Sequence, residues 1–328
     1  MSKTTLIKVT GINRFYGNTH AVKDLEFELH TGDILGFLGP NGAGKSTTMQ
    51  IISGSLAPDA GQIEINGIDL VEKPTSAKQQ LGYLPEQPPL YKELTVDEYL
   101  DYSARLRELN KNDIPAAVEK AKKRCGLSEV GTKLISSLSK GYQQRVGIAQ
   151  AIIHTPAVII LDEPTVGLDP IQIKEIRQLI TELGKDHGVI LSTHILPEVL
   201  AVCNRVQIIQ QGELVYHSDM ETITKNMQSG QIELSFKNTA DLTLIQNING
   251  ITQADQLNDK NFCIELSDNE TEYEQAINTL LNTAVDNNWI LTRMAPRVRS
   301  LEQIFIDLTV NDNSRASTVD TTEAGSEQ

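Results

Sequence analysis

The chain has 328 residues, with 29 lysines and arginines against 43 aspartates and glutamates, so its formal net charge is −14. This length suits one large domain or two ordinary ones, and a hydrophobic content of 39% excludes a largely disordered chain. No apolar run approaches the ~18 residues that cross a bilayer, so we expect no direct membrane span. The acidic balance argues against a nonspecific grip on nucleic acid, and the three widely spaced cysteines are expected to be reduced thiols.

The acidity is distributed unevenly along the chain. Residues 1–217 contain 22 basic and 25 acidic residues, residues 218–310 contain 6 and 14, and the last 18 residues contain 1 and 4. The composition changes near His217, and the final segment is polar with almost no large apolar residues. We therefore predict a first domain of residues 1–217, a second domain of residues 218–310 and a disordered acidic tail of residues 311–328.

The first domain has the pattern of an α/β fold. Val158–Leu161 and Val189–Leu191 are continuous β-branched runs, which are typical of strands buried on both faces of a parallel sheet. Residues 93–125 and 141–153 are predicted helices, so a helical insertion spanning about residues 87–153 separates the early strands from the later ones. The other predicted elements are a strand Ile34–Leu38, helices Ser46–Ile52 and Ile171–Leu183, and a hairpin of Val206–Gln210 with Glu213–Tyr216.

The second domain shows a different order of elements. Its apolar periodicity predicts a β-α-β-β-α-β series, which indicates a small ferredoxin-like α+β fold. A capping-box pattern at Ser300 predicts one more helix after it. The strands and helices of the series are predicted at Gln231–Phe236, Ala240–Asn247, Ile251–Leu257, Phe262–Leu266, Tyr273–Ala284 and Trp289–Met294.

A glycine-rich segment between the strand Ile34–Leu38 and the helix that follows matches the pattern GxxxxGK[ST]. Glycines let the backbone wrap closely around a phosphate, so that its N–H groups and the helix N-terminus face the anion. Lys45 adds a positive charge for the β- and γ-phosphates, and the Ser46 hydroxyl can ligate Mg²⁺. The predicted nucleotide-binding residues of this loop are Gly39, Pro40, Asn41, Gly42, Ala43, Gly44, Lys45, Ser46 and Thr47.

Two acids, Asp162 and Glu163, end the buried strand Val158–Leu161. Acids at strand ends are often solubilising caps, but beside a phosphate loop the end of a parallel strand is where a Mg²⁺-directed carboxylate is expected. Asp162 is assigned that position. Glu163 points elsewhere and can orient or deprotonate the attacking water, so it is the candidate catalytic base.

These motifs stand in the order found in ABC transporters, and residues 5–217 resemble the ATP-binding subunit of that family. The resemblance is to a cassette of the exporter branch with a C-terminal accessory domain. It implies a phosphate-loop ABC-type ATPase that uses ATP and Mg²⁺. The segments that carry the resemblance, besides the phosphate loop, are LSKGYQQR at 138–145, DEPT at 162–165, GLDP at 167–170, STH at 192–194 and the aromatic Tyr16.

The resemblance assigns a role to several single residues. It implies that Tyr16, which lies 29 positions before Lys45, stacks on adenine. It implies that His194 senses the γ-phosphate and belongs with Glu163 and Lys45 among the catalytic residues. Asp169, in the segment that follows the two strand-end acids, is assigned to the nucleotide site.

The segment at 138–145 resembles the family signature, which closes over the ATP of a partner subunit. Ser139 and Gly141 begin a helix, and a helix N-terminus attracts anions. The resemblance therefore implies a homodimer of cassettes with two nucleotides between them. Lys140 stands where the family has glycine, and its charge either strengthens phosphate attraction or faces solvent.

A second departure concerns the segment GYLPE at 82–86. Glu86 occupies the position where the family usually has the glutamine that touches Mg²⁺ and the attacking water, and Gln87 follows it. Glu86 is assigned to the nucleotide and metal sites together with Ser46 and Asp162, although the sequence leaves open whether Glu86 or Gln87 makes the contact.

The expected function is ATP hydrolysis that drives export through a separately encoded integral membrane permease. The protein would be cytoplasmic and peripheral on the inner face of the cell membrane. The alternative is a soluble ABC-type ATPase acting on ribosomes or DNA. It is less favoured, because the chain holds one cassette, no coiled coil and a net negative charge. Residues 218–310 could sense a ligand, aid dimerisation or cap the cassette as a structural domain.

Overall fold

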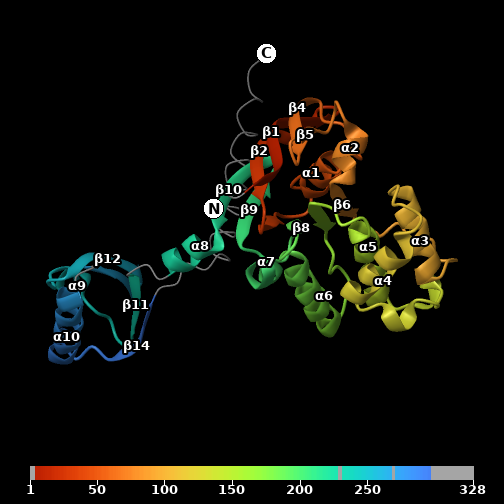
Figure 1. Cartoon of the computed structure of the whole chain (residues 1–328). Coiled ribbons are helices and arrows are strands. Elements are labelled where there is room, and N and C mark those ends of the chain that lie inside the picture. Colours follow the sequence, from red (N-terminus) through yellow and green to blue (C-terminus); the bar gives the residue numbers. More distant parts are fainter. Residues whose placement is uncertain (1–3, 228–230, 268–269, 297–328) are drawn as a thin grey trace, which may run out of the picture. The chain divides into compact units, whose positions relative to one another are not determined.

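The computed structural model of the chain describes residues 4–227, 231–267 and 270–296 (Figure 1). The chain divides into two compact units, with the change from one to the other between Met220 and Glu221. The predicted tail of residues 311–328 and the predicted helix at Ser300 lie outside the described residues. Among the described helices, none combines the length and the apolar character that crossing a bilayer requires.

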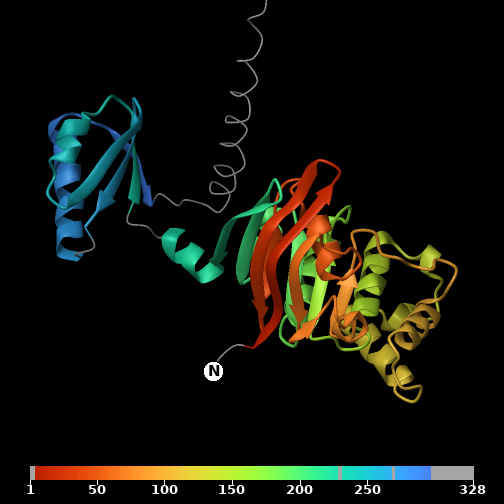
Figure 2. The same cartoon turned by 90° about the horizontal axis from the view of Figure 1, so that it is seen from above.

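The first unit begins with a four-stranded antiparallel sheet in the order β2-β1-β4-β5. Its longest strands, β1 (Thr5–Tyr16) and β2 (Thr19–His30), form a hairpin that Figure 2 shows in red. The two short strands are β4 (Ala60–Ile65) and β5 (Ile68–Asp69). None of these four strands was predicted. Polar residues occupy much of the exposed face of β1 and β2, and bulges interrupt their alternation, which hides the period of two.

A second sheet of six strands carries the predicted phosphate loop and strand-end acids. Its order is β10-β9-β3-β8-β7-β6, with β9 to β6 parallel and β10 antiparallel at one edge. The prediction of buried parallel strands is confirmed, because every residue of β3, β7 and β8 is buried. The strands are β3 (Ile34–Leu38), β6 (Leu81–Leu84), β7 (Val158–Asp162), β8 (Gly188–Thr193), β9 (Arg205–Gln210) and β10 (Glu213–Asp219).

Helix α1 (Lys45–Ile52) packs into the main hydrophobic core together with residues from both sheets. Its residues Met49, Ile51 and Ile52 are almost wholly buried, and the helix lies against β2, β7 and β8. Burying three large side chains contributes roughly 2 kcal/mol each, so the helix is held by its packing and not by its propensity. The N-terminus of α1 is thereby fixed at the end of β3.

The helical insertion contains α3 (Val96–Leu106), α4 (Ile114–Cys125) and α5 (Lys140–Ile152), which gather on one side of the six-stranded sheet (Figure 1). The prediction of one helical stretch over residues 93–125 is wrong in its middle. Helix α3 starts with a complete capping box at Thr95 and Glu98, and it ends before Glu108, whose φ is +58°. The polar segment between Leu106 and Ile114 has no apolar face to continue the helix.

The remaining helices of the first unit flank the strands that carry the site. They are α2 (Pro74–Gln79), α6 (Pro170–Leu183) and α7 (Leu196–Val202), together with the short 3₁₀ segments Ser128–Val130 and Ile135–Ser137. Helix α8 (Met220–Met227) begins where β10 ends.

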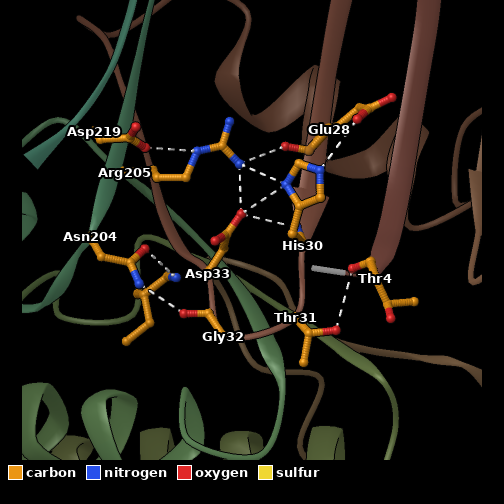
Figure 3. A network of polar contacts seen from close by, with 10 residues as sticks. Thr4, Glu28, His30, Thr31, Gly32, Asp33, Asn204, Arg205 and Asp219 are labelled. Atoms are coloured by element: carbon orange, nitrogen blue, oxygen red, sulfur yellow. Dashed lines mark hydrogen bonds and ion pairs between the residues drawn. The ribbon is translucent and has the colours of Figure 1, made fainter. Parts of the chain in front are cut away.

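A buried ion pair fixes the turn that feeds strand β3. The carboxylate of Asp33 is fully buried and accepts a bond of 2.6 Å from Nη1 of Arg205, while the ring of His30 lies 3.3 Å from the same oxygen (Figure 3). Arg205 also reaches Asp219 at 3.4 Å, and the side chain of Asn204 accepts from the backbone N–H of Ile34 at 2.9 Å. The ends of β2, β9 and β10 are therefore tied to the first residues of β3.

The second unit has the predicted order of elements. It contains β11 (Gln231–Phe236), α9 (Leu242–Gln246), β12 (Ile251–Asn258), β13 (Asn261–Leu266), α10 (Glu270–Asp286) and β14 (Leu291–Pro296). The four strands form one antiparallel sheet in the order β12-β13-β11-β14. Its two helices cover one face of the sheet (Figure 2), where Leu234, Phe262 and Leu280 are at most 1% exposed.

His154 joins the end of helix α5 to the six-stranded sheet. Its Nε2 lies 3.1 Å from the carbonyl oxygen of Leu81, and because a carbonyl only accepts, Nε2 carries the proton. Burial, with a smaller contribution from the charge of Arg107, lowers the pKa of His154 to about 4. The imidazole is therefore neutral over the physiological range.

Because of this lowered pKa, His154 is expected to make the folded protein less stable at acidic pH. In the unfolded chain its pKa is near 6.5, so between pH 6.5 and about 4 the unfolded state binds a proton that the folded state does not. Stability present above pH 6.5 is expected to fall by roughly 3 kcal/mol as the pH approaches 4. Urea unfolding of wild type and His154→Gln across this pH range measures this loss of stability. Glutamine keeps an N–H for the carbonyl oxygen of Leu81 and cannot be protonated. The two stability curves should converge towards acid, and parallel curves would refute the assignment.

Candidate active site

The phosphate loop joins strand β3 to helix α1. Its residue just before the helix has a backbone conformation that only glycine adopts without strain. Gly44 has φ +105° and caps α1, and a methyl group on it would lie 2.6 Å from the carbonyl oxygen of Ala21. Gly39 approaches the backbone as closely, because a methyl group there would lie 2.4 Å from the carbonyl oxygen of Ile209. The first N–H groups of α1 therefore lie at the end of a tightly held loop. Free N–H groups at a helix N-terminus attract phosphate.

Lys45 directs its ammonium group into this loop. Its side chain is 6% exposed, and Nζ donates to the carbonyl oxygens of Gly39 at 2.9 Å and Pro40 at 3.2 Å. The same nitrogen lies 3.6 Å from Oε1 of Glu163. A buried cation is thus held between the loop carbonyls and the carboxylate that follows strand β7.

Glu163 is held in an uncommon backbone conformation, with φ +48°. Non-glycine residues in this region cost of order 1 kcal/mol and often mark functional positions. Its carboxylate is 7% exposed, and both oxygens lie 3.0 Å from Nδ1 of His194 at the end of β8. A carboxylate only accepts, so Nδ1 carries a proton. The two residues therefore form a hydrogen-bonded pair beside the phosphate loop.

Asp162, Ser46 and Glu86 supply oxygen atoms that suit Mg²⁺. Asp162 is 2% exposed, and its Oδ1 has no hydrogen-bond partner among the described residues. Burial raises the pKa of Asp162, and the negative charges of Glu163 and Glu86 add to the rise, whereas the hydroxyls of Ser192 and Ser46 oppose it. A divalent cation would satisfy the orphaned oxygen and relieve the repulsion.

The described residues contain no cluster of three or more metal-binding side chains. The oxygens of Asp162, Ser46 and Glu86 suit Mg²⁺, which proteins usually bind through one or two oxygens, with phosphates and water as the other ligands.

One cavity of about 560 Å³ brings most of the predicted residues together. Its volume is in the usual range for a nucleotide-sized ligand. Glu86 lines it and Gln87 does not, so the geometry favours Glu86 in the position that the sequence left open. The lining residues are Tyr16, Ala21, Asn41, Gly42, Gly44, Lys45, Ser46, Thr47, Glu86, Glu163, Val166 and His194.

Seven predicted site residues do not line this cavity: Gly39, Pro40 and Ala43 of the phosphate loop, Asp162 at the end of β7, and Ser139, Gly141 and Asp169. Ser139 caps helix α5, and Asp169 caps helix α6 by accepting from the N–H groups of Ile171 and Gln172. Gly141 packs against the side chain of Gln172, where an added methyl group would lie 2.7 Å from Cδ. For Ser139 and Gly141, the contact with a partner's nucleotide stays a prediction.

Of the two alternatives that the sequence left open for Lys140, the structure agrees with the one in which it faces solvent. Its side chain is exposed, yet Nζ lies against the backbone of Gly167, so closely that a methyl group on Gly167 would be 2.2 Å away. The lysine thus joins the start of α5 to the segment before α6.

Sequence reasoning missed a buried acid behind the site. Glu198, on helix α7, is 1% exposed and accepts hydrogen bonds from the hydroxyls of Thr165 and Thr193. In the sequence it is a single acid in a short segment of mixed polarity, and nothing local marks it as buried. Ala21 and Val166, which also line the cavity, carry no chemical signal.

The phosphate loop offers a stability test with a matched control. In Gly44→Ala, the strained φ costs about 1 kcal/mol, and the collision with the Ala21 carbonyl adds an estimated 1–3 kcal/mol. In Gly42→Ala, with φ +81°, no atom lies within 4 Å of the added methyl group, so only the strain remains. The free energy of unfolding, measured without nucleotide, should fall more for Gly44→Ala. Equal losses would show that the close approach is not a constraint.

The fold and the cavity are those of a phosphate-loop, nucleotide-binding protein. Comparison with known proteins gives the family: the sequence profile of the ABC transporter family matches residues 22–166. The bacitracin transport ATP-binding protein BcrA of Bacillus licheniformis is 38% identical over 240 residues, which are 72% of this chain and 78% of BcrA. The linearmycin resistance ATP-binding protein LnrL of Bacillus subtilis is 30% identical over 93% of this chain and 98% of LnrL.

A solved structure of the ATP-binding subunit of an ABC transporter superposes with a TM-score of 0.61 and 32% identity. The superposition covers 67% of this chain and 92% of the chain in that structure. The chain belongs to the family of ABC transporter ATP-binding proteins. It is therefore an ATPase with an α/β cassette fold, and both the predicted family and the predicted enzyme class are confirmed.

Proposed function

We propose that this ATPase drives the export of a substrate through a separately encoded membrane permease. Two relatives support the direction, since BcrA is named for bacitracin transport and LnrL for linearmycin resistance. Removing a toxic compound from the cell is the simplest way in which a transport ATPase confers resistance. The protein would then lie on the inner face of the cell membrane, bound to its permease.

The observation that carries the chemical part of the proposal is the meeting of Lys45, Glu163 and His194 in one cavity. Nδ1 of His194 lies 3.0 Å from the Glu163 carboxylate, and Nζ of Lys45 lies 3.6 Å from it. These distances support the proposal that Glu163 accepts a proton from water beside the cation that would meet the phosphates.

Each of these residues is proposed to have its own role in hydrolysis. Lys45 and the N–H groups at the start of α1 hold the β- and γ-phosphates and stabilise the charge that develops on them. Glu163 accepts a proton from the attacking water, and His194 orients Glu163 and reaches the γ-phosphate. Mg²⁺, held by Ser46, Asp162 and Glu86, would neutralise phosphate charge when bound. Tyr16 offers its exposed ring, over which Arg14 lies at 5.1 Å, for stacking on adenine.

We further propose that two copies of the chain close over two ATP molecules. Ser139 and Gly141 stand at the N-terminus of α5, away from the cavity of their own chain. A helix N-terminus favours an anion, and the γ-phosphate of a partner's ATP is the anion that the family resemblance provides. Closure with ATP and opening after hydrolysis would be the mechanical output. Residues 218–310 are proposed to be a structural accessory domain of this motor.

Purification from detergent-solubilised membranes tests the proposed partner. The full chain, tagged and expressed in its own host, should co-purify with a protein of several membrane spans, and ATP hydrolysis of the pair should exceed that of the chain alone. The tagged Lys45→Ala variant controls for contacts that need nucleotide. Recovery only with ribosomes or DNA would contradict the transport function and favour the soluble alternative.

A further inference from the structure

Helix α7 carries a buried acid for which the proposed chemistry has no direct use. Glu198 is 1% exposed, and an ionised carboxylate in such a place is costly unless each oxygen is satisfied. Both oxygens are satisfied here. One accepts from the hydroxyl of Thr165, and the other accepts from the hydroxyl of Thr193 at 2.7 Å.

The two threonines belong to the segments that present the catalytic pair. Thr165 follows Glu163 by two residues, and Thr193 directly precedes His194. Both threonines are buried, and the hydroxyl of Thr193 also accepts from the N–H of Ile195 at 3.1 Å. The carboxylate of Glu198 is thus bonded to two threonines. One lies next to His194 in the chain, and the other lies two positions after Glu163.

The sheet does not hold these two segments together at this point. The pairing of β7 with β8 ends at Asp162 and Ser192, and one backbone bond of 2.9 Å, from the N–H of Glu163 to the carbonyl of Ser192, follows it. After that bond, the segment that follows β7 leads to α6 and the segment that follows β8 leads to α7. Besides the Glu163–His194 pair itself, the carboxylate of Glu198 joins them through charge-assisted hydrogen bonds, which are stronger than neutral ones.

We propose that Glu198 is a positioning residue that sets the separation of Glu163 and His194 by holding Thr165 and Thr193 at once. An ionised carboxylate is suited to this task because it only accepts, and both threonine hydroxyls donate to it. A glutamine in its place would present one acceptor and one donor, so one of the two hydroxyl bonds would be lost or reversed. The inference rests on the proposed roles of Glu163 and His194.

Glu198→Gln tests the proposal with little change in volume. Steady-state hydrolysis by the full chain should show kcat reduced about 10- to 100-fold, in keeping with a displaced general base, and KM for ATP changed less than about threefold. Leu200→Gln is the matched control, since this residue lies on the same helix and is 46% exposed. The control should keep the wild-type kcat. Wild-type kcat in Glu198→Gln would overturn the proposal.

A mutant cycle separates positioning from general loss of structure. Thr193→Val removes one donor and should lower kcat in the wild-type background, but it should have little further effect in Glu198→Gln, because the bond is already impaired. Thr165→Val should behave in the same way. Additive effects in both pairs would overturn the proposal, and so would a fall in kcat that is matched by a loss of ATP binding and thermal stability. The valine variants alone decide the question if Glu198→Gln does not fold.

Comparing turnover in Glu163→Gln and in Glu198→Gln distinguishes an error in the positioning role from an error in the proposed function. If Glu163→Gln abolishes turnover while Glu198→Gln does not lower it, the catalytic roles stand and the positioning role is wrong. If Glu163→Gln keeps its turnover, the proposed chemistry itself is wrong.

Discussion

The Glu163→Gln variant is expected to bind ATP with wild-type affinity and to hydrolyse it about 10²- to 10⁴-fold more slowly. A positioned general base contributes a rate factor of about this size. Glutamine has nearly the same shape, but its amide cannot take a proton from water. The side chain of Glu163 is almost buried between Lys45 and His194, so no solvent base can easily replace it.

Phosphate release and the binding of a fluorescent ATP analogue measure the two halves of this expectation. Glu182→Gln is a suitable control, because Glu182 is an exposed acid on helix α6. The control should keep both activities. Turnover within threefold of wild type in Glu163→Gln would remove Glu163 from the catalytic role, and loss of ATP binding would show that the carboxylate is structural.

The Lys45→Ala variant is expected to lose most of its affinity for ATP. The side chain of Lys45 is 6% exposed and its ammonium points into the loop where phosphate would lie, so hydrogen bonds to the anion would form away from bulk water. Charge-assisted bonds of this kind contribute up to about 3 kcal/mol, or roughly 100-fold in Kd. Turnover should become undetectable at ATP concentrations that saturate the wild type.

Calorimetric titration with ATP, with and without Mg²⁺, gives the two Kd values directly. Lys185→Ala removes an exposed lysine paired with Glu182 and should bind ATP as the wild type does. Thermal unfolding without nucleotide must be compared as well, because Lys45 also bonds to the carbonyl oxygens of Gly39 and Pro40. A folded Lys45→Ala variant with wild-type affinity would show that the phosphates bind elsewhere.

The sequence predicts the phosphate loop and its surroundings well because their chemistry is local. Gly39 to Ser46 must follow one another for the loop to form, and the strand before them and the helix after them have clear apolar patterns. The same holds for Asp162 and Glu163, which end a fully buried strand. The antiparallel strands β1 and β2 were missed because their exposed faces are polar and bulges break the alternation.

Contacts between distant segments could not be predicted in the same way. The position of Glu198 between Thr165 and Thr193 depends on how α7 folds back against the ends of two strands, and no spacing in the sequence encodes that. Glu86 and Gln87 are neighbours in the chain, and only the course of the backbone after β6 directs Glu86 to the cavity. The contact of Lys140 with Gly167 likewise needs the packing of α5 beside α6.

In the proposed dimer, ATP is hydrolysed at a site shared by two chains, with the phosphate loop of one and the N-terminus of α5 of the other. Lys45→Ala disables the first part. Ser139→Asp disables the second, because aspartate still caps the helix but repels a phosphate. Each variant alone should be inactive, and a mixed dimer of the two should contain one intact site.

Phosphate release from mixtures of Lys45→Ala and Ser139→Asp is therefore the most direct measurement. At a ratio of one to one, activity should reappear and approach about a quarter of the wild-type rate, since half of the dimers are mixed and each has one of two sites. Mixtures that stay inactive, with both variants folded and able to dimerise, would contradict the shared site. Full activity of Ser139→Asp by itself would contradict it as well.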